Sequence, residues 1–167
     1  SVAVVMLTEV DYRSGRLHDM KAVTAKAHAV GALTIWDLAH SAGATPVDLA
    51  GANADFALGC TYKYLNGGPG APAFLYVRPD LQDRVQPPLA GWWGHASPFA
   101  FDLDYRPHAG ITRNQCGTQP ILSMAALDAA LDVWDGIDMQ AVRKKSMALC
   151  GLFADLAETR CGRHGVK

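Results

Sequence analysis

The sequence has almost no net charge and few cysteines. Its 167 residues include 15 basic and 16 acidic side chains, which give a formal net charge of −1. This balance provides no electrostatic footprint for nucleic acid or for an anionic membrane surface, so neither is expected as a partner. The cysteines are Cys60, Cys116, Cys150 and Cys161, and no CxxC pair occurs among them. A zinc site and a dithiol redox motif are therefore not predicted, and scattered thiols are typical of a reducing cytosol.

Long apolar runs are also missing. The opening run, residues 2–7, is too short to span a bilayer and has neither the basic start nor the cleavage site of a signal peptide. Hydrophobic residues nonetheless make up 50% of the chain, which is enough for a globular core. We therefore expect a cytoplasmic globular chain. Because the sequence opens inside an apolar run and closes without a stop signal, we also expect further sequence on both sides.

Short apolar runs alternate with helix-forming segments. Strands are predicted at residues 2–7, 33–37, 54–60 and 73–77, and helices at 18–30, at 121–134 and from Asp138 onward. This alternation predicts an α/β fold with a mostly parallel sheet covered by helices on both faces. One apolar face of the helix at 121–134 would hold Leu122, Ala125, Ala126, Ala129 and Val133, and the buried side of the last helix would hold Val142, Met147, Leu149, Leu152 and Leu156. Residues 87–117 form a long aromatic loop without periodicity, and such loops are usually functional or interfacial.

A lysine between two tyrosines is the most informative feature of the sequence. Lys63 follows the predicted strand 54–60 and precedes a glycine-rich run at 67–70. A lysine at the end of a buried strand is costly to keep charged, so desolvation favours its neutral amine, which can form a Schiff base with a carbonyl. The glycines would let the backbone approach a ligand closely. Alone the pattern is weak, because most lysines beside a glycine loop lie at surface turns.

A carboxylate and an imidazole follow the preceding predicted strand. The strand at 33–37 ends in Asp37, and His40 follows it closely. Open α/β sheets bind ligands at the carboxyl ends of their strands. A strand ending in Asp, followed by a strand ending in Lys, is the arrangement that binds pyridoxal phosphate: the acid keeps the pyridine nitrogen protonated and the amine binds the aldehyde. Asp37 could instead cap the segment that follows it, and His40 could be a structural histidine.

Three separated motifs give the chain a family resemblance: WDLAHSAG at 36–43, CTYKYLNGGPG at 60–70 and GWWGH at 91–95. In this order they resemble the kynureninase family of fold-type I pyridoxal phosphate enzymes. The resemblance implies that residues 1–136 form the middle and C-terminal part of the cofactor-binding large domain, and that 137–167 form a helix leading into a small C-terminal domain. The family's phosphate-binding loop and its substrate-carboxylate arginine would lie upstream and downstream of this chain.

The resemblance also implies an activity. Kynureninases hydrolyse L-kynurenine to anthranilate and L-alanine, in tryptophan catabolism and NAD biosynthesis, and they act as homodimers. Gly117 and Thr118 stand where animal members have serine and asparagine, a pairing typical of bacterial enzymes that prefer kynurenine to its 3-hydroxy form. A polypeptide limited to these residues is expected to be inactive, because parts of the family's site would be missing.

The resemblance assigns roles to individual residues. Lys63 would bind the cofactor and move protons, Asp37 would pair with the ring nitrogen, and Tyr62 would bind the phosphate and donate a proton. Further contacts to the cofactor would come from Thr8, His40, Trp92 and Thr118, the last two from the partner subunit of the dimer. Tyr64 is the rival of Tyr62, and Trp93 is the rival of Trp92. No group of histidines has metal-ligand spacing, so no metal is expected.

Two other interpretations stay open. A cysteine desulfurase or another class-V aminotransferase-like enzyme would share the layout of Asp37 and Lys63, but such enzymes usually place a histidine where Tyr62 stands. A non-catalytic fragment that keeps the fold would take up no cofactor, and replacing Lys63 would leave its properties unchanged. Substrate tests with cysteine and kynurenine would separate the two enzymes.

Overall fold

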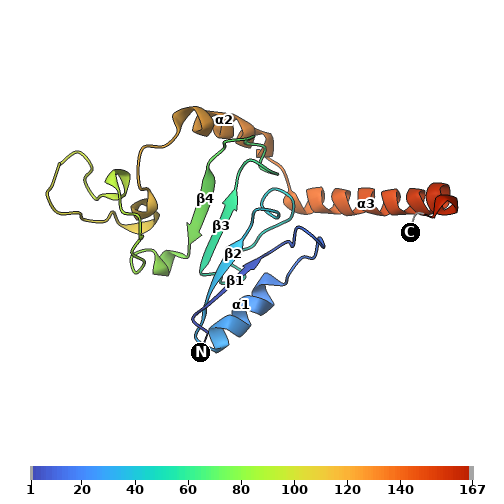
Figure 1. Ribbon diagram of the computed structural model, residues 1–167, viewed down its shortest axis with the longest axis horizontal. Helices are drawn as coiled ribbons and strands as arrows, with labels where there is room; N and C mark the ends of the chain where they lie inside the picture. The colour runs from blue at the N-terminus through green and yellow to red at the C-terminus, as the bar shows by residue number, and fades with distance from the viewer. Residues whose placement is uncertain (1, 166–167) are drawn as a thin grey trace.

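The computed structural model describes residues 2–165 and is built on a four-stranded sheet with the strand order β1-β2-β3-β4. The strands are β1 (Val4–Thr8), β2 (Leu33–Asp37), β3 (Phe56–Cys60) and β4 (Ala73–Val77) (Figure 1). β1, β2 and β3 run parallel, and β4 pairs antiparallel with β3. The predicted α/β class and mostly parallel sheet are therefore confirmed, and the bounds of β2 and β4 agree with the prediction.

One helix, α1 (Met20–Ala29), packs on the sheet and closes the core. Asp19 starts it as the N-cap, because its side chain accepts a hydrogen bond from the Ala22 amide at 2.9 Å. Trp36 of β2 is buried beneath the helix, and its indole N–H donates to the Thr24 hydroxyl at 3.1 Å. The buried apolar residues of this core are Met20, Trp36, Leu38, Ala52, Ala54 and Ala57. A fully buried indole needs such a partner, so α1 is fixed on the sheet by both packing and a polar contact.

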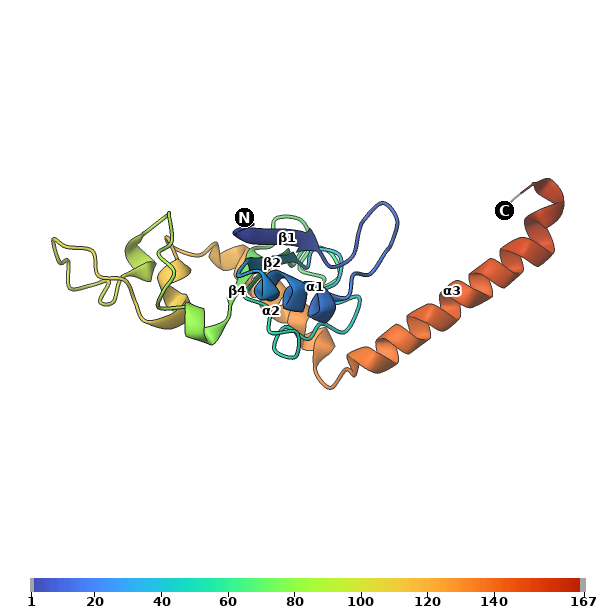
Figure 2. The ribbon, with the colours of Figure 1, turned by 90° about the horizontal axis from the view of Figure 1, so that it is seen from below.

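Within residues 2–165 the helices lie on one face of the sheet, so helices over the second face, which were also expected, are not found among these residues. Figure 2 shows α1 on one side of the strands, with no helix of residues 2–165 over the opposite side. The open face presents apolar side chains that are between 39% and 59% exposed: Val4, Met6, Leu33 and Leu75. Alternating strand residues point to opposite faces, so the strands could be predicted but not what lies against each face.

The parallel register brings the carboxyl ends of three strands to one edge. Thr8 pairs with Asp37, and Asp37 pairs with Leu58. Residues 38–55 then cross from β2 to β3 as turns rather than as a helix, and residues 61–72 return to β4. The segments that follow β1, β2 and β3 therefore meet at the same edge, which is where parallel sheets bind ligands.

Residues 83–118 form a lobe that projects from the sheet, named here the projecting lobe (Figure 1). It contains short 3-10 helices at Trp92–Gly94 and Gly110–Asn114, and a further one at Pro79–Leu81 leads into it. Its internal centre is Arg113, which is 7% exposed and donates to Asp83 Oδ1 at 2.7 Å and to the His108 carbonyl at 3.0 Å. Polar contacts to one buried guanidinium are therefore among the interactions that hold the lobe together.

Two helices end the described chain. α2 (Ile121–Leu131) continues into a 3-10 helix at Asp132–Trp134, and α3 (Met139–Cys161) continues into another at Gly162–His164. α2 lies across the edge where β3 ends, while α3 extends away from the body (Figures 1 and 2). Asp138 starts α3 as its N-cap, accepting from the Gln140 amide at 2.9 Å. The sequence predicts two units, residues 1–136 and 137–167. Ser1 of the first unit and Val166 and Lys167 of the second lie outside the described residues.

The predicted buried faces of these two helices are wrong. In α2 the buried residue is Leu127, whereas Leu122 is 88% exposed and Val133, just beyond the helix, is 65% exposed. In α3 no residue is buried, and the apolar positions predicted to pack, among them Met147 and Leu152, are each 54% exposed. α2 is apolar around its circumference, so its periodicity could not select one face.

Within residues 2–165, no helix combines the length and apolarity needed to cross a bilayer.

Candidate active site

The centre of the site is a contact between Lys63 and His40. The Lys63 Nζ atom lies 2.9 Å from His40 Nε2, so the two nitrogens share a hydrogen bond. His40 belongs to the turn after β2, and Lys63 to the turn after β3. Neither nitrogen can donate and accept at once in this contact, so one carries the shared proton and the other offers its lone pair. The geometry allows a proton to pass between amine and imidazole.

Asp37 is the last residue of β2 and lies half-buried at the same edge. Its Oδ1 accepts a hydrogen bond from the Ala39 amide at 2.8 Å, so the carboxylate also stabilises the turn that carries His40. The capping role considered for Asp37 is thus real, and it uses one oxygen. Among residues 2–165, its other oxygen accepts no recorded hydrogen bond and remains free for a ligand.

Thr8 ends β1 beside Asp37. Its hydroxyl donates to the Val10 carbonyl at 2.8 Å and lies 3.4 Å from the Asp37 carbonyl. The Glu9 amide also donates to the Asp37 carbonyl, at 3.0 Å. These contacts tie the end of β1 to the end of β2. The Thr8 oxygen keeps lone pairs for a ligand, but its proton is directed to the backbone.

Three tyrosines surround the central contact. The Tyr12 ring stacks on the His40 ring with centroids 6.1 Å apart, and Lys63 Nζ lies 5.5 Å from the Tyr62 ring centroid. Tyr62 and Tyr64 are 48% and 47% exposed. β3 ends at Cys60 and turns follow, so strand alternation does not set the directions of these two side chains. Tyr64 lines a cavity of about 240 Å³ with His40, Arg143 and Ser146.

The lysine is less buried than expected. Lys63 is half-buried and lies in a turn beyond β3, so the loss of solvent expected at the end of a buried strand is only partial. The turn is nevertheless tightly built: the Gly67 amide donates to the Thr61 carbonyl at 2.9 Å. A Cβ on Gly67 would stand 3.2 Å from Leu127 Cδ1 of α2. This close approach serves the chain's own packing, and it explains why a glycine follows the lysine motif.

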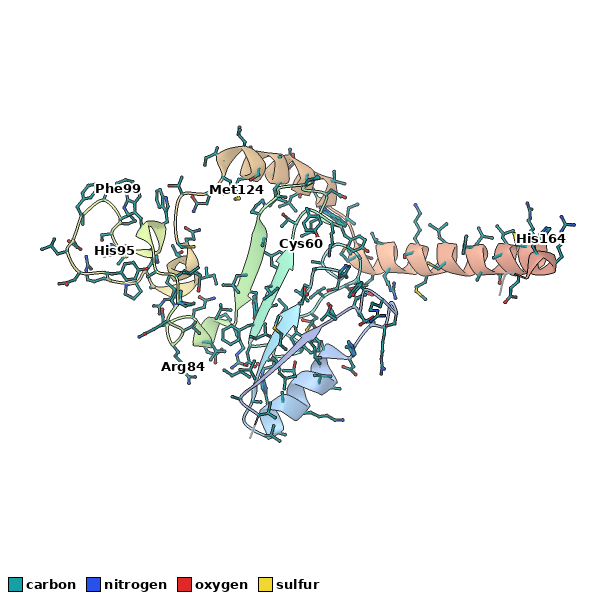
Figure 3. The ribbon with its side chains drawn as sticks, viewed as in Figure 1. Cys60, Arg84, His95, Phe99, Met124 and His164 are labelled. Carbon is teal, nitrogen blue, oxygen red and sulfur yellow. The ribbon has the colours of Figure 1, made fainter. Side chains whose placement is uncertain are left out.

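Two predicted cofactor contacts lie elsewhere. Trp92 stacks on Trp93 at 5.8 Å and packs edge-on against Phe99 at 5.3 Å, in the projecting lobe. Thr118, at the end of the lobe, accepts a hydrogen bond from the Trp93 indole at 3.3 Å. Figure 3 shows Phe99 and His95 well separated from Cys60 at the end of β3. Within residues 2–165, the site therefore brings together Thr8, Asp37, His40, Tyr62 and Lys63, but neither Trp92 nor Thr118.

Three residues of the site were not singled out from the sequence. Tyr12 stacks on the His40 ring, Ser41 is buried within the turn that carries His40, and Glu9 is buried directly after β1. Burial raises the pKa of the Glu9 carboxyl, while the neighbouring Ser41 hydroxyl lowers it. The only sequence signal for these two was their position, directly after Thr8 and directly after His40.

The donor set suits a charged heteroaromatic aldehyde. An amine, an imidazole, a carboxylate with a free oxygen and hydroxyl groups converge at one sheet edge. Pyridoxal phosphate needs an amine for its aldehyde and an acid for its ring nitrogen, and both residue types are present there. The residues present therefore fit this cofactor.

Comparison with known proteins agrees with this chemistry. The aminotransferase class-V family matches residues 1–157, and the chain belongs to that family. A kynureninase of Pseudomonas fluorescens is 58% identical over 162 residues, which are 97% of this chain and 39% of that protein. The chain thus spans about two fifths of the length of this relative.

Solved structures share the fold at lower identity. An apo cysteine desulfurase of Thermococcus onnurineus superposes with a TM-score of 0.76 at 23% identity, covering 93% of this chain and 38% of that one. A lysine-to-alanine variant of C-DES, solved with glycine covalently linked to its pyridoxal phosphate cofactor, superposes with a TM-score of 0.70 at 19% identity, covering 89% and 39%. At these identities the likeness establishes the fold alone.

Proposed function

We propose that this chain is part of a kynureninase, which hydrolyses L-kynurenine to anthranilate and L-alanine with pyridoxal phosphate. The observation that supports the substrate is the 58% identity to the Pseudomonas fluorescens kynureninase across 97% of the chain. The observation that supports the cofactor is the convergence of Lys63, His40 and Asp37 at one sheet edge.

The roles proposed for the chain's residues follow from their contacts. When bound, the cofactor would supply an electron sink for the substrate's α-carbon, and Lys63 would hold its aldehyde. Asp37, with one oxygen free, would hold the ring nitrogen protonated. Lys63 Nζ would take and return protons at the substrate, and His40 Nε2, at 2.9 Å, could share its proton. Tyr62, beside that amine, would donate a proton from its phenol.

The proposal also covers the two predicted phosphate contacts that lie away from Lys63 within one chain. Trp92 and Thr118 lie in the projecting lobe, and an indole N–H and a hydroxyl are suitable donors to phosphate. We infer that they act on the site of a second subunit, so that the working enzyme is a cytoplasmic homodimer with kynurenine as its small-molecule substrate. Tryptophan catabolism and NAD biosynthesis are the pathways that this activity would serve.

A substrate comparison tests the proposal on the native protein that contains this chain, supplied with pyridoxal phosphate. We expect release of anthranilate from kynurenine and no sulfur release from cysteine. The Lys63→Ala variant should lose kynurenine turnover by several orders of magnitude, while Lys26→Ala, at an exposed position of α1, should keep it. Turnover of cysteine instead would favour a desulfurase, whose fold is shared. Inactivity of the native protein toward both would favour a non-catalytic role.

A further inference from the structure

A cavity beside His40 is not used by the proposed chemistry. Its volume is about 240 Å³, and its walls come from the segment after β1, the turn after β2, Tyr64 and the first turns of α3. His40 lines it, whereas the other residues gathered at the sheet edge, Lys63 and Asp37 among them, do not. The cavity is therefore separate from the place proposed for the cofactor, and His40 belongs to both.

The cavity is lined by basic groups and by no acid. Arg143 and His40 line it, and no aspartate or glutamate does. Among residues 2–165, no ion pair involves Arg143. Asp11, in the segment after β1, accepts from the Ser14 amide at 2.7 Å and does not line the cavity. A guanidinium without a carboxylate partner favours an anionic ligand, which it can hold with two parallel N–H donors.

The burial of α3 singles out the same arginine. α3 has no buried residue, and Lys144 and Lys145 are exposed, but Arg143 and Ser146 are half-buried. Residues three positions apart lie on one face of a helix, so this face of α3 is the one that lines the cavity. Ser146 and Thr45 add hydroxyl groups to the lining, and hydroxyl groups can donate to an anion.

Other parts of the lining are apolar and closely packed. Val10 and Leu17 line the cavity and pair with each other in an antiparallel bridge, which closes the loop between them. Gly43 lies next to Ala44 of the lining and has a φ of +83°, and a Cβ on Gly43 would stand 2.8 Å from the Tyr64 carbonyl carbon. The turn after β2 is thus packed directly on Tyr64. Such walls suit a ligand that has an apolar body and an anionic head.

We propose that this cavity is a carboxylate subsite that binds a small aromatic monocarboxylate. Arg143 holds the carboxylate, and the apolar ring lies against Val10 and Leu17. An aromatic body suits the cavity because the Tyr64 ring can also pack against it.

The subsite has a consequence for the proposed reaction because His40 lines it. A carboxylate bound there contacts the imidazole whose Nε2 lies 2.9 Å from Lys63 Nζ. Occupancy should therefore lower the turnover of kynurenine. This consequence rests on the proposed function, whereas binding of the carboxylate can be measured without cofactor or substrate.

The test uses the native protein with benzoate as the probe. Ligand-observed NMR titrations measure the affinity for benzoate with and without pyridoxal phosphate, and benzamide, which has the same ring without the charge, is the matched ligand. The variants are Arg143→Gln and Ser146→Phe. The control is Lys145→Gln, which removes one positive charge from an exposed position of the same helix. Circular dichroism and thermal unfolding check the fold and stability of each variant.

The native protein should bind benzoate with a Kd on the order of 1 mM and benzamide about tenfold more weakly or worse. Arg143→Gln should weaken benzoate binding about tenfold or more, because charge-assisted hydrogen bonds are lost. Ser146→Phe should weaken it to a similar extent without changing the charge, because the phenyl ring fills the cavity. Lys145→Gln should keep the affinity within about twofold. Pyridoxal phosphate should not compete with benzoate.

Kinetics with the cofactor-loaded protein test the consequence for turnover. Saturating benzoate should lower kcat for kynurenine about twofold or more in the native protein and in Lys145→Gln. At the same benzoate concentration, the loss in Arg143→Gln should be much smaller, because its subsite is mostly empty.

Equal binding of benzoate and benzamide, or a benzoate affinity that Arg143→Gln or Ser146→Phe leaves unchanged, would overturn the subsite. Competition with pyridoxal phosphate would place benzoate in the cofactor site and overturn it as well. Absence of benzoate binding, with stability lost in Arg143→Gln, would mean that an acid of the whole protein already pairs with the guanidinium, which also overturns it.

Two further outcomes concern the reaction. Benzoate binding without any effect on kcat would overturn the link from the subsite to His40. A native protein that does not turn over kynurenine would count against the proposed function instead, and the titrations would still decide whether the subsite exists.

Discussion

A single proton lies between Lys63 and His40. Their nitrogens are 2.9 Å apart, and a hydrogen bond at this distance requires one lone pair and one N–H. An imidazole nitrogen can either donate or accept in such a contact, so His40 is suited to passing a proton to or from the amine. The Tyr12 ring stacks on the imidazole, with the ring centroids 6.1 Å apart.

Asp37→Asn separates the two roles assigned to the Asp37 carboxylate, which are to accept from the turn and to charge the cofactor's ring nitrogen. The variant keeps an oxygen for the Ala39 amide, so the turn should remain intact. It removes the charge that would hold the cofactor's ring nitrogen protonated, so kcat for kynurenine should fall about 10²-fold or more, with the cofactor still bound. Steady-state kinetics and cofactor content measure the two effects, and Asp48→Asn on the exposed turn is the control. Full activity of Asp37→Asn would contradict this role.

Asp55 is a buried carboxylate far from this chemistry, and its contacts predict a pH effect on stability. Its side chain is fully buried; it lies 2.7 Å from His28 Nε2 and 2.8 Å from Arg78 Nη1, and it accepts from the Thr34 amide at 2.8 Å. Burial alone would raise the pKa of Asp55, but the hydrogen bonds from His28 and Thr34 outweigh burial and hold that pKa below its usual value.

Because the pKa of Asp55 is lower in the folded chain than in the unfolded one, its ionised form stabilises the fold above the ordinary carboxyl pKa of about 4. This stabilisation is lost as the pH falls through the folded value. Asp55→Asn should lower the free energy of unfolding at pH 7 by about 3 kcal/mol and flatten its dependence on acid pH. Denaturant titrations from neutral to acid pH measure both. Asp80→Asn, on the exposed side of Arg78, should have a much smaller effect; equal losses would contradict the account.

Among the elements, the projecting lobe depends on close backbone packing. A Cβ on Gly91 would stand 1.6 Å from the Cys116 carbonyl oxygen, whereas a Cβ on Gly117 would meet nothing within 4 Å. Gly91→Ala should therefore destabilise the lobe by about 3 kcal/mol or more, because backbone cannot yield as a side chain does. Gly117→Ala is the matched control and should leave stability unchanged. Limited proteolysis of residues 83–118 measures the difference, and equal cleavage of the two variants would contradict it.

The elements also show how far the sequence could predict the fold. The run at 33–37 and the capped helix after Asp19 could be placed because apolar runs and caps are local signals. The meeting of His40 and Lys63 could be anticipated from parallel topology, which gathers the carboxyl ends of the strands.

Other features depend on what lies against an element, which local pattern does not encode. The exposed side chains of Leu122 and Met147 belong to helices that were predicted to bury them. The burial of Glu9 and Ser41 could not be anticipated either, because it depends on how the segments after β1 and β2 are covered in the folded chain. Burial of a polar group is a property of the assembled fold.

At the scale of the whole molecule, two features of the site lie apart. Lys63 and Asp37 lie at the sheet edge, while Trp92 and Thr118 lie in the projecting lobe. The chain also spans 39% of the length of the Pseudomonas fluorescens kynureninase. If the lobe completes the site of a second subunit, mixing inactive variants should restore activity.

The mixing experiment uses Lys63→Ala and the double variant Trp92→Ala/Thr118→Ala of the native protein, each inactive as a homodimer. Their heterodimer has one site with an intact lysine and an intact lobe from the partner. Random reassociation should therefore recover about a quarter of the native activity, since half of the dimers are mixed and each has one working site. Size-exclusion chromatography confirms that dimers form. No recovery from mixed dimers would place the lobe and the lysine in the same subunit's site.

The central claim is that Lys63 is the residue that binds the cofactor's aldehyde. The direct measurement is borohydride reduction of the native protein loaded with pyridoxal phosphate, followed by peptide mapping. We predict that the reduced label is found on Lys63, within the peptide that contains Tyr62 and Tyr64. A label on any other lysine, or no label at all, would contradict the account.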